Sequence, residues 1–333
     1  MAITGFTKVI SKNMKKVILI LLGFYPIMNM YGQQYPQVSQ FMYDHTSTNA
    51  GSAGSMDMVC TSVIARQQWV GFTGAPQDFI LNVNAPFNLF GASHGVGMSI
   101  YRDTYGFNED IQLQFSYAYR IPIHDGKLGI GVSGAFLNRV VDGTKWHVPE
   151  NGTNFWDLTG DNAIPQGKQN EFAFDMGFGL FYRTEDLYVG ISSTHLLESQ
   201  YKFPNTNGSE AIDKLKRHYF VTASYNITLA NPSFEIIPSV FIASDVSVTS
   251  LDLNTSLLYN KKFWGGVTYR PGSAIIGMLG LEILNGLKIG YSYDFPTSKI
   301  INHSQGTHEV VINYCFKIGV EKSPQKYKSI RFL

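Results

Sequence analysis

From about residue 58 onward the chain is dominated by short segments in which apolar and polar side chains alternate. In segment 111–121, six apolar side chains from Ile111 to Ile121 occupy the odd positions, and Gln112, Gln114, Ser116, Ala118 and Arg120 occupy the even ones. Segments 251–260 and 287–294 repeat the pattern. A period of two residues predicts β-strands with one apolar and one polar face. Many such segments of roughly ten residues are typical of a transmembrane barrel, whose apolar face contacts lipid.

The alternation and the turn residues together predict about fourteen antiparallel strands in one up-and-down barrel. The predicted strands are 58–68, 77–85, 93–102, 109–122, 127–138, 170–182, 186–197, 214–227, 234–245, 249–260, 262–270, 274–284, 286–294 and 307–316. The long connections, 139–169, 198–213 and 295–306, are all odd-numbered, whereas the even ones are short apart from 86–92. A Greek-key sandwich has no reason to place every long loop on one side, so the parity favours the barrel. Pro122, Pro238 and Pro271 are expected at bulges or strand ends.

Composition excludes several other classes. Charged residues make up 15% of the chain, yet no apolar run beyond the N-terminus is long enough for a membrane helix. The chain contains 32 Gly, 19 Tyr and 23 Phe but only 2 Cys, which suits tight turns and aromatic belts rather than a disulfide scaffold. A net charge of +1 without a basic stripe argues against a nucleic-acid partner.

The two ends of the chain flank this single domain. Lys15 and Lys16 precede an apolar run at 17–22, and Gly32 precedes Gln33, so we interpret 1–32 as an export signal, with Met14 as an alternative start. Residues 33–57 then form the mature N-terminal segment, 58–316 the barrel and 317–333 a basic tail. In a bacterial barrel with an even strand count both ends are expected in the periplasm. The tail is either a solvated end or a docking element for lipid headgroups or a partner protein.

Three stretches of the chain resemble the PorP/SprF family of type IX secretion proteins. They are 33–43 (QQYPQVSQFMY), 49–55 (NAGSAGS) and, most specifically, 66–76 (RQQWVGFTGAP), and further similar residues follow in order up to Val310. Residues 44–48 depart from the family, whose members commonly carry an Asn-Pro pair there. The resemblance implies a non-enzymatic outer-membrane component of the Bacteroidota export machine, linked in some species to gliding motility. It also implies partners, namely other secretion subunits including the periplasmic ring, and cargo with C-terminal secretion signals, with no cofactor.

The stretch 66–76 has two interpretations. It is either a partner-binding loop, because Trp and Arg supply much of the energy at interfaces, or a structural hairpin that uses glycine at tight turns. The candidate partner-binding residues are Arg66, Gln67, Gln68, Trp69, Gly71, Phe72, Gly74, Ala75 and Pro76.

Cys60 and Cys315 fall in the first and last predicted strands, which pair when a barrel closes. Both alternate with polar neighbours, so both are expected to face the lumen. A disulfide across the seam is therefore a hypothesis, with two unpaired small residues as the alternative.

Catalytic and metal-binding signals are weak. The 8 His residues show no zinc-site spacing, and no G-x-S-x-G nucleophile elbow is present, so we expect neither a metal nor an enzyme. The serious alternative is a passive channel for a small solute, because about fourteen strands leave a lumen wider than side chains alone would fill. The long connection 139–169 is a candidate to plug that lumen.

Overall fold

The structure, a computed structural model, describes residues 36–145, 167–204 and 210–317. The predicted export signal, the tail beyond Lys317 and most of the connection 139–169 lie outside the described residues. No helix among the described residues is long and apolar enough to span a membrane.

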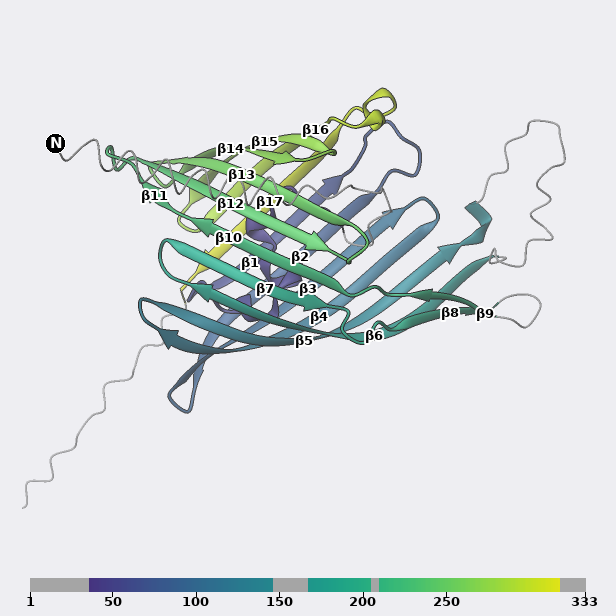
Figure 1. The fold of residues 1–333 in the computed structure, drawn as a ribbon, viewed down its shortest axis with the longest axis horizontal. Helices are drawn as coiled ribbons and strands as arrows, with labels where there is room; N and C mark the ends of the chain where they lie inside the picture. Colours follow the sequence, from purple (N-terminus) through teal and green to yellow (C-terminus); the bar gives the residue numbers. More distant parts are fainter. Residues whose placement is uncertain (1–35, 146–166, 205–209, 318–333) are drawn as a thin grey trace, which may run out of the picture. The chain divides into compact units, whose positions relative to one another are not determined.

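The described chain forms one closed antiparallel β-barrel (Figure 1). Its strands are β1 (Val59–Gln67), β2 (Gln77–Leu89), β3 (Ala92–Tyr105), β4 (Asn108–Ile123), β5 (Gly126–Asp142), β6 (Lys168–Arg183), β7 (Leu187–Thr194), β10 (His218–Tyr225), β11 (Ile227–Thr228), β12 (Phe234–Ser244), β13 (Thr249–Tyr259), β14 (Phe263–Arg270), β15 (Ala274–Leu284), β16 (Leu287–Pro296) and β17 (Thr307–Phe316). Strands that follow one another in this list pair with each other, except that β10 and β11 both pair with β12, and β1 pairs with β17 to close the seam. Because β11 continues β10 along the same edge of β12, the barrel has fourteen strands, as predicted.

The connections follow the predicted parity, with one correction. The sequence predicted a long connection at 86–92, but β2 continues to Leu89 and β3 begins at Ala92, so only two residues form this turn. Pro86 stays in register opposite Gly95, where the ladder tolerates it. The structure also shows strands in the predicted loop 198–213. Here β8 (Gln200–Pro204) and β9 (Glu210–Lys214) pair as a separate two-stranded hairpin.

Two of the three prolines lie at strand ends. Pro122 is the penultimate residue of β4, and Pro271 directly follows β14. Pro238 lies inside β12 and pairs with Thr255 of β13. On its other side the ladder stops at Ser224 and resumes at Ile227, so the missing proline donor coincides with a break between β10 and β11.

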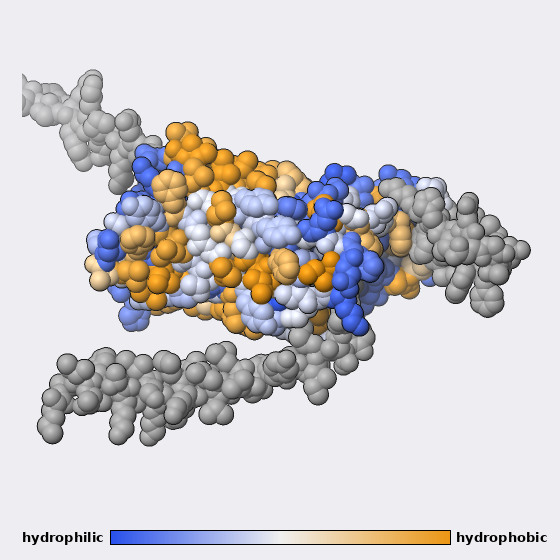
Figure 2. Space-filling model, turned by 90° about the horizontal axis from the view of Figure 1, so that it is seen from above, coloured by the Kyte–Doolittle hydropathy of each residue, from blue (hydrophilic) through white to orange (hydrophobic). Residues whose placement is uncertain are grey.

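The alternating faces are oriented as a membrane barrel requires. In β4, Phe115, Tyr117 and Tyr119 are exposed, whereas Gln114 and Arg120 are buried. Exposed apolar side chains form patches along the outer surface, separated by residues of intermediate hydropathy, and the ends carry more hydrophilic residues (Figure 2). The buried residues of the strands are largely polar or charged, so the interior is a polar lumen rather than an oily core.

Candidate functional site

The lumen is occupied by the chain's own N-terminal segment, residues 36–58, which we call the lumen segment. It contains three helical turns, η1 (Phe41–Tyr43), α2 (His45–Thr48) and η2 (Ala50–Ser52), seen in purple inside the barrel in Figure 1. Most of its residues between Val38 and Ala53 are buried, although they belong to no sheet. A segment without regular pairing must satisfy its backbone groups elsewhere, and it does so largely on the barrel wall.

An ionic cluster holds the beginning of the lumen segment. Arg66 of β1 contacts Asp294 of β16 at 2.8 Å and Glu309 of β17 at 3.0 Å, with all three side chains almost fully buried. Arg66 also donates to Ser39 Oγ at 2.6 Å. The Glu309 carboxylate accepts hydrogen bonds from the backbone N–H groups of Ser39 and Gln40, both at 2.8 Å. Every buried charge in the cluster therefore has a partner, the condition under which buried ion pairs persist.

A second buried ion pair extends this cluster. Arg270 of β14 forms two hydrogen bonds of 2.6 Å with Asp252 of β13 and lies 3.7 Å from Asp294. Its Nη2, which donates one of these bonds, also donates to the carbonyl of Val38 at 3.4 Å. The charges of five strands thus converge on the first residues of the lumen segment.

Hydrogen bonds from β2, β4 and β7 hold the middle of the segment. Asn82 of β2 donates to Asp44 at 2.8 Å, and Gln114 of β4 donates to the carbonyl of Thr46 at 3.2 Å. Ser192 of β7 donates to the carbonyl of Thr48 at 2.7 Å. Backbone carbonyls that no helix or sheet uses are satisfied in this way.

Glycines in the wall allow the backbone of η2 to approach. A Cβ at Gly129 of β5 would lie 2.1 Å from the carbonyl oxygen of Gly51, and one at Gly95 of β3 would lie 1.9 Å from that of Ala53. A Cβ at Gly179 of β6 would lie 2.1 Å from the side chain of Asn49. The contacts at Gly95 and Gly129 are with backbone oxygens far inside van der Waals distance, so only glycine fits at these two wall positions, whereas Gly179 leaves room for the Asn49 side chain.

Apolar contacts complete the fit. Val38 packs against Ile64, Ile80 and Val311, and the ring of Phe41 stacks on Phe241 of β12 at 5.3 Å. The lumen segment is therefore held by charge, hydrogen bonding, close backbone packing and apolar burial at once.

The end of the lumen segment is fixed near the terminal end of the barrel, where β1 begins and β17 ends. Asp57 contacts Arg120 at 2.8 Å and Lys127 at 2.9 Å. Partial burial acts to raise the pKa of Asp57, but the hydrogen bonds and charges of these two cations outweigh it and hold the pKa below its ordinary value.

The hairpin β8–β9 packs on the inner face of β5 toward the opposite end. Tyr201 and Phe203 are buried against Leu137 and Val141. The guanidinium of Arg139 lies 4.9 Å from the centre of the Tyr201 ring, and it also pairs with Asp110. Between this hairpin and the lumen segment lies a cavity of about 60 Å³, room for a few water molecules at most.

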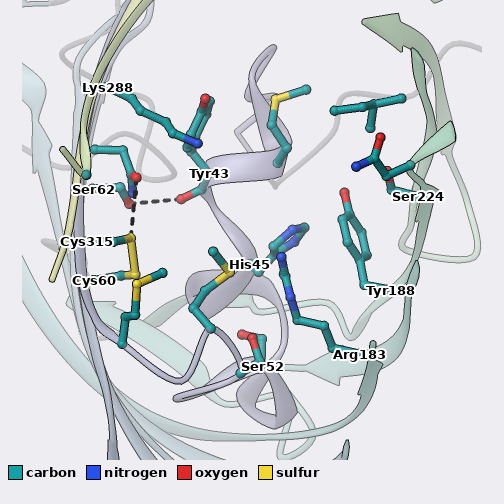
Figure 3. A pocket seen from close by; sticks show the side chains of 18 of the residues that line it. Tyr43, His45, Ser52, Cys60, Ser62, Arg183, Tyr188, Ser224, Lys288 and Cys315 are labelled. Atoms are coloured by element: carbon teal, nitrogen blue, oxygen red, sulfur yellow. Dashed lines mark hydrogen bonds between the residues drawn. A yellow bond between two sulfur atoms is a disulfide. The ribbon is translucent and has the colours of Figure 1, made fainter. Parts of the chain in front are cut away.

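A much larger cavity, of about 770 Å³, lies between the lumen segment and the terminal end. His45 of the lumen segment and Arg183 and Tyr188 of the wall line it, as does the pair Cys60 and Cys315 (Figure 3). Burial, and then the nearby charge of Arg183, lowers the pKa of His45 to about 3, so this imidazole is neutral at physiological pH.

The structure separates the predicted partner-binding residues into two groups. Arg66 lies in the lumen, where it anchors the lumen segment, and Gln67 ends β1. The remaining residues lie in the loop 68–76 at the end opposite the termini, where Phe72 is 50% exposed. The backbone N–H of Val70 donates to the carbonyl of Gly306 at 2.8 Å, and that of Gln305 donates to the carbonyl of Val70 at 2.7 Å. That this loop binds a partner stays a prediction.

Cys60 and Cys315 lie directly opposite each other across the β1–β17 seam, on the lumen face. Their sulfur atoms are bonded in the structure, and the two positions are 255 apart in sequence. Formation of this bond in the mature protein stays a prediction, tested in the Discussion.

The lumen segment itself was not predicted as a plug, because it has no strand or helix period. The usable signal is the match between the small residues 49–54 and the lumen-facing glycines of β3, β5 and β6. A second signal is the number of charged residues on the inner faces of β1, β13, β14, β16 and β17. Among the described residues, no cluster of three or more His, Cys, Asp or Glu side chains has a geometry able to hold a metal ion.

Comparison with known proteins gives the family. The model of the type IX secretion system membrane protein family PorP/SprF matches residues 30–314. No curated protein matches the chain.

The Ralstonia pickettii toluene transporter TbuX is a similar solved structure, with 13% identity, 83% of this chain and 94% of that chain covered, and a TM-score of 0.48. A Pseudomonas aeruginosa FadL homologue shares 10% identity, and the match covers 85% of this chain and 99% of that chain with a TM-score of 0.43. The Acinetobacter baumannii outer membrane protein Omp33 shares 8% identity, and the match covers 79% of this chain and 100% of that chain with a TM-score of 0.43. With the family match spanning nearly all of the barrel and its lumen segment, this chain belongs to the PorP/SprF family of type IX secretion system membrane proteins.

Proposed function

We propose that this outer-membrane barrel is a non-enzymatic platform of the type IX secretion system, which supports the secretion or surface anchoring of cargo proteins. Membership of the PorP/SprF family supports the link to this secretion system. The observation that carries the platform role is the occupied lumen, because a barrel filled by its own chain offers its two ends, rather than its interior, to other proteins.

Orientation follows from the connections. In bacterial outer-membrane barrels the short turns face the periplasm and the long loops face outward. The barrel begins at Val59 and ends at Phe316 on the side of the short turns, which supports the proposal that both ends of the barrel face the periplasm. The periplasmic turns are then available to other secretion subunits, including the periplasmic ring. The opposite end is available to cargo with C-terminal secretion signals, including gliding adhesins in motile species, while the apolar belt contacts membrane lipid.

The outward loops are built as a firm surface. Loop 68–76 is tied to loop 297–306 through Val70 and to the β3–β4 turn through a hydrogen bond of 2.9 Å from Gly106 N–H to the carbonyl of Gly74. Trp69 adopts a positive φ of 50°, and its N–H donates to Thr307 Oγ1 at 3.1 Å. A loop ordered before binding loses less entropy when a partner docks. This favours the partner-binding interpretation of 68–76.

Gene deletion followed by quantitative proteomics of secreted and surface proteins tests the proposal, with a complemented strain as control. We expect cargo of the type IX system to be retained in the cell. Retention of nearly all cargo identifies a core component, and loss of one or two surface adhesins identifies a cargo-specific accessory. An unchanged profile would refute a role in secretion.

The alternative, a passive solute channel, is tested by conductance of the purified full chain in planar bilayers. We expect the wild-type barrel to conduct little because the lumen segment occupies its interior. A variant lacking residues 36–57 is the positive control and should conduct. High conductance of the wild type together with unchanged secretion would favour the channel.

A further inference from the structure

Arg183 differs from the other arginines of the described chain. Arg66, Arg102, Arg120, Arg139 and Arg270 each pair with a carboxylate, and Arg217 donates to the carbonyl of Leu196. The side chain of Arg183 forms no ion pair or hydrogen bond with any residue in the described ranges, although the residue is half-buried at the end of β6. An unpaired guanidinium inside a protein is costly, because all five of its N–H donors seek acceptors.

Aromatic contacts fix the position of this guanidinium. It lies 5.7 Å from the centre of the Tyr188 ring of β7, on which it can rest as a cation on an aromatic face. Tyr188 is held in turn by Phe181, stacked at 5.6 Å, and by His45 of the lumen segment, edge-on at 4.7 Å. Figure 3 shows Arg183 and Tyr188 side by side on one wall, facing the cavity, with His45 beside them.

The cavity that Arg183 faces has the size and chemistry of a small-molecule site. Its volume of about 770 Å³ lies within the usual range of ligand pockets. Met42, Met56, Met58, Trp264 and Leu258 contribute apolar lining. Methionine side chains adapt their shape to an apolar guest.

Other charges act on Arg183, but none among the described residues forms an ion pair with it. Asp57 attracts it at longer range, and the Asp57 carboxylate is itself paired with Arg120 and Lys127. Glu185 and Asp186 are exposed residues of the β6–β7 turn, and Glu282 accepts a hydrogen bond from the N–H of Gly286 at 2.9 Å. Lys288 and Lys317 add positive charge to the lining. His45, the titratable group in contact with Tyr188, is neutral as described above.

We propose that this cavity binds an amphipathic organic anion, with a carboxylate head on Arg183 and an apolar body against the methionines and Trp264. A planar guanidinium matches the two oxygens of a carboxylate, and the charge-assisted hydrogen bonds are stronger than neutral ones. The cavity lies on the terminal side of the lumen segment. Binding of a small anion there is a separate property from the secretion role and does not depend on it.

Octanoate is the probe, titrated by calorimetry into the full-length protein in lipid nanodiscs, with empty nanodiscs subtracted. Replacing Arg183 by Met keeps the volume and removes the charge, and we expect the Kd for octanoate to rise by about tenfold to a hundredfold, as loss of a charged hydrogen-bonding partner implies. The matched control is Arg102→Met, which removes an arginine far from the cavity and should leave the Kd unchanged. Octanol, the uncharged analogue, should bind the wild type and Arg183→Met equally.

Three results would overturn the proposal: equal octanoate affinity of wild type and Arg183→Met, acetate binding as tightly as octanoate, or no heat beyond that of empty nanodiscs. Folding of each variant is checked by the mobility of the unheated barrel in electrophoresis. If Arg183→Met does not fold, Arg183→Gln replaces it, with the same expected loss. Because binding is measured on the isolated protein, failure here leaves the secretion test unaffected.

Discussion

Replacing Glu309 by glutamine is expected to loosen the lumen segment while leaving the barrel closed. One carboxylate oxygen of Glu309 accepts from Ser39 N–H and Arg66, and the other accepts from Gln40 N–H. Glutamine has the same shape, but its NH₂ group would face one of these donors whichever way the amide is turned. A buried donor then faces another donor, and neither has an acceptor.

The size of the effect follows from the burial of the cluster. Removing one partner of a buried ion pair costs about 3–5 kcal/mol. Arg66 keeps its contact with Asp294 at 2.8 Å, so we expect the lower end, about 3 kcal/mol. If this cost falls on the docked state of the lumen segment, its opening equilibrium rises on the order of a hundredfold.

Hydrogen exchange measured by mass spectrometry on the nanodisc-embedded protein reads this equilibrium directly, because amides of a segment exchange through its local opening. Peptides covering 36–58 should exchange on the order of a hundredfold faster in Glu309→Gln, with strand peptides unchanged. Glu109→Gln is the matched control, since Glu109 pairs with Arg102 on the exposed surface, where such a pair contributes little. Equal exchange of 36–58 in the two variants would refute the anchoring role of Glu309.

Three further expectations follow from the same contacts. Gly129→Val should expel the lumen segment and raise bilayer conductance, because its Cβ would lie 2.1 Å from the carbonyl oxygen of Gly51. The control is Gly277→Val, which should leave conductance unchanged because no atom lies within 4 Å of its Cβ. Equal conductance of the two variants would count against close packing of the segment on the wall. Non-reducing mass spectrometry should recover the peptides of Cys60 and Cys315 linked to each other, and two free thiols would exclude the bond. Cys60→Ser should lower the free energy of unfolding by about 2–4 kcal/mol. Because the pKa of Asp57 is lowered in the folded state, its stabilising contribution is present above the ordinary carboxylate pKa and is lost as pH falls through the lowered value. Wild type should therefore unfold at a higher temperature than Asp57→Asn at neutral pH, and this difference should disappear at acid pH.

The strands could be predicted from sequence because their information is local. In β4 the alternation of Phe115 and Tyr117 with Gln114 and Ser116 specifies both the strand and its faces, and the observed boundaries of most strands lie within a few residues of the predicted ones. The extra strand length at 86–92 was missed because Pro86 suggested a loop, although the ladder opposite Gly95 accommodates it.

The site could not be predicted in the same way. Ser39 contacts Glu309 across 270 residues of sequence, and neither residue marks the other through any local period. The motif 66–76 predicts a partner-binding role for Arg66 together with its neighbours in sequence, yet its position on the inner face of β1 places its side chain in the lumen. Long-range complementarity of this kind is expressed only when the barrel has closed.

The position of the ionic anchor on the seam has a consequence for biogenesis. Arg66 belongs to the first strand and Glu309 to the last, and they face each other in the register that closes the barrel. A sheet that closed around a water-filled lumen would leave both side chains without their contacts to Ser39 and Gln40. Docking of the N-terminal segment therefore adds contacts to both edge strands at once and favours their joining, so that the exported chain supplies a template around which its own barrel is sealed.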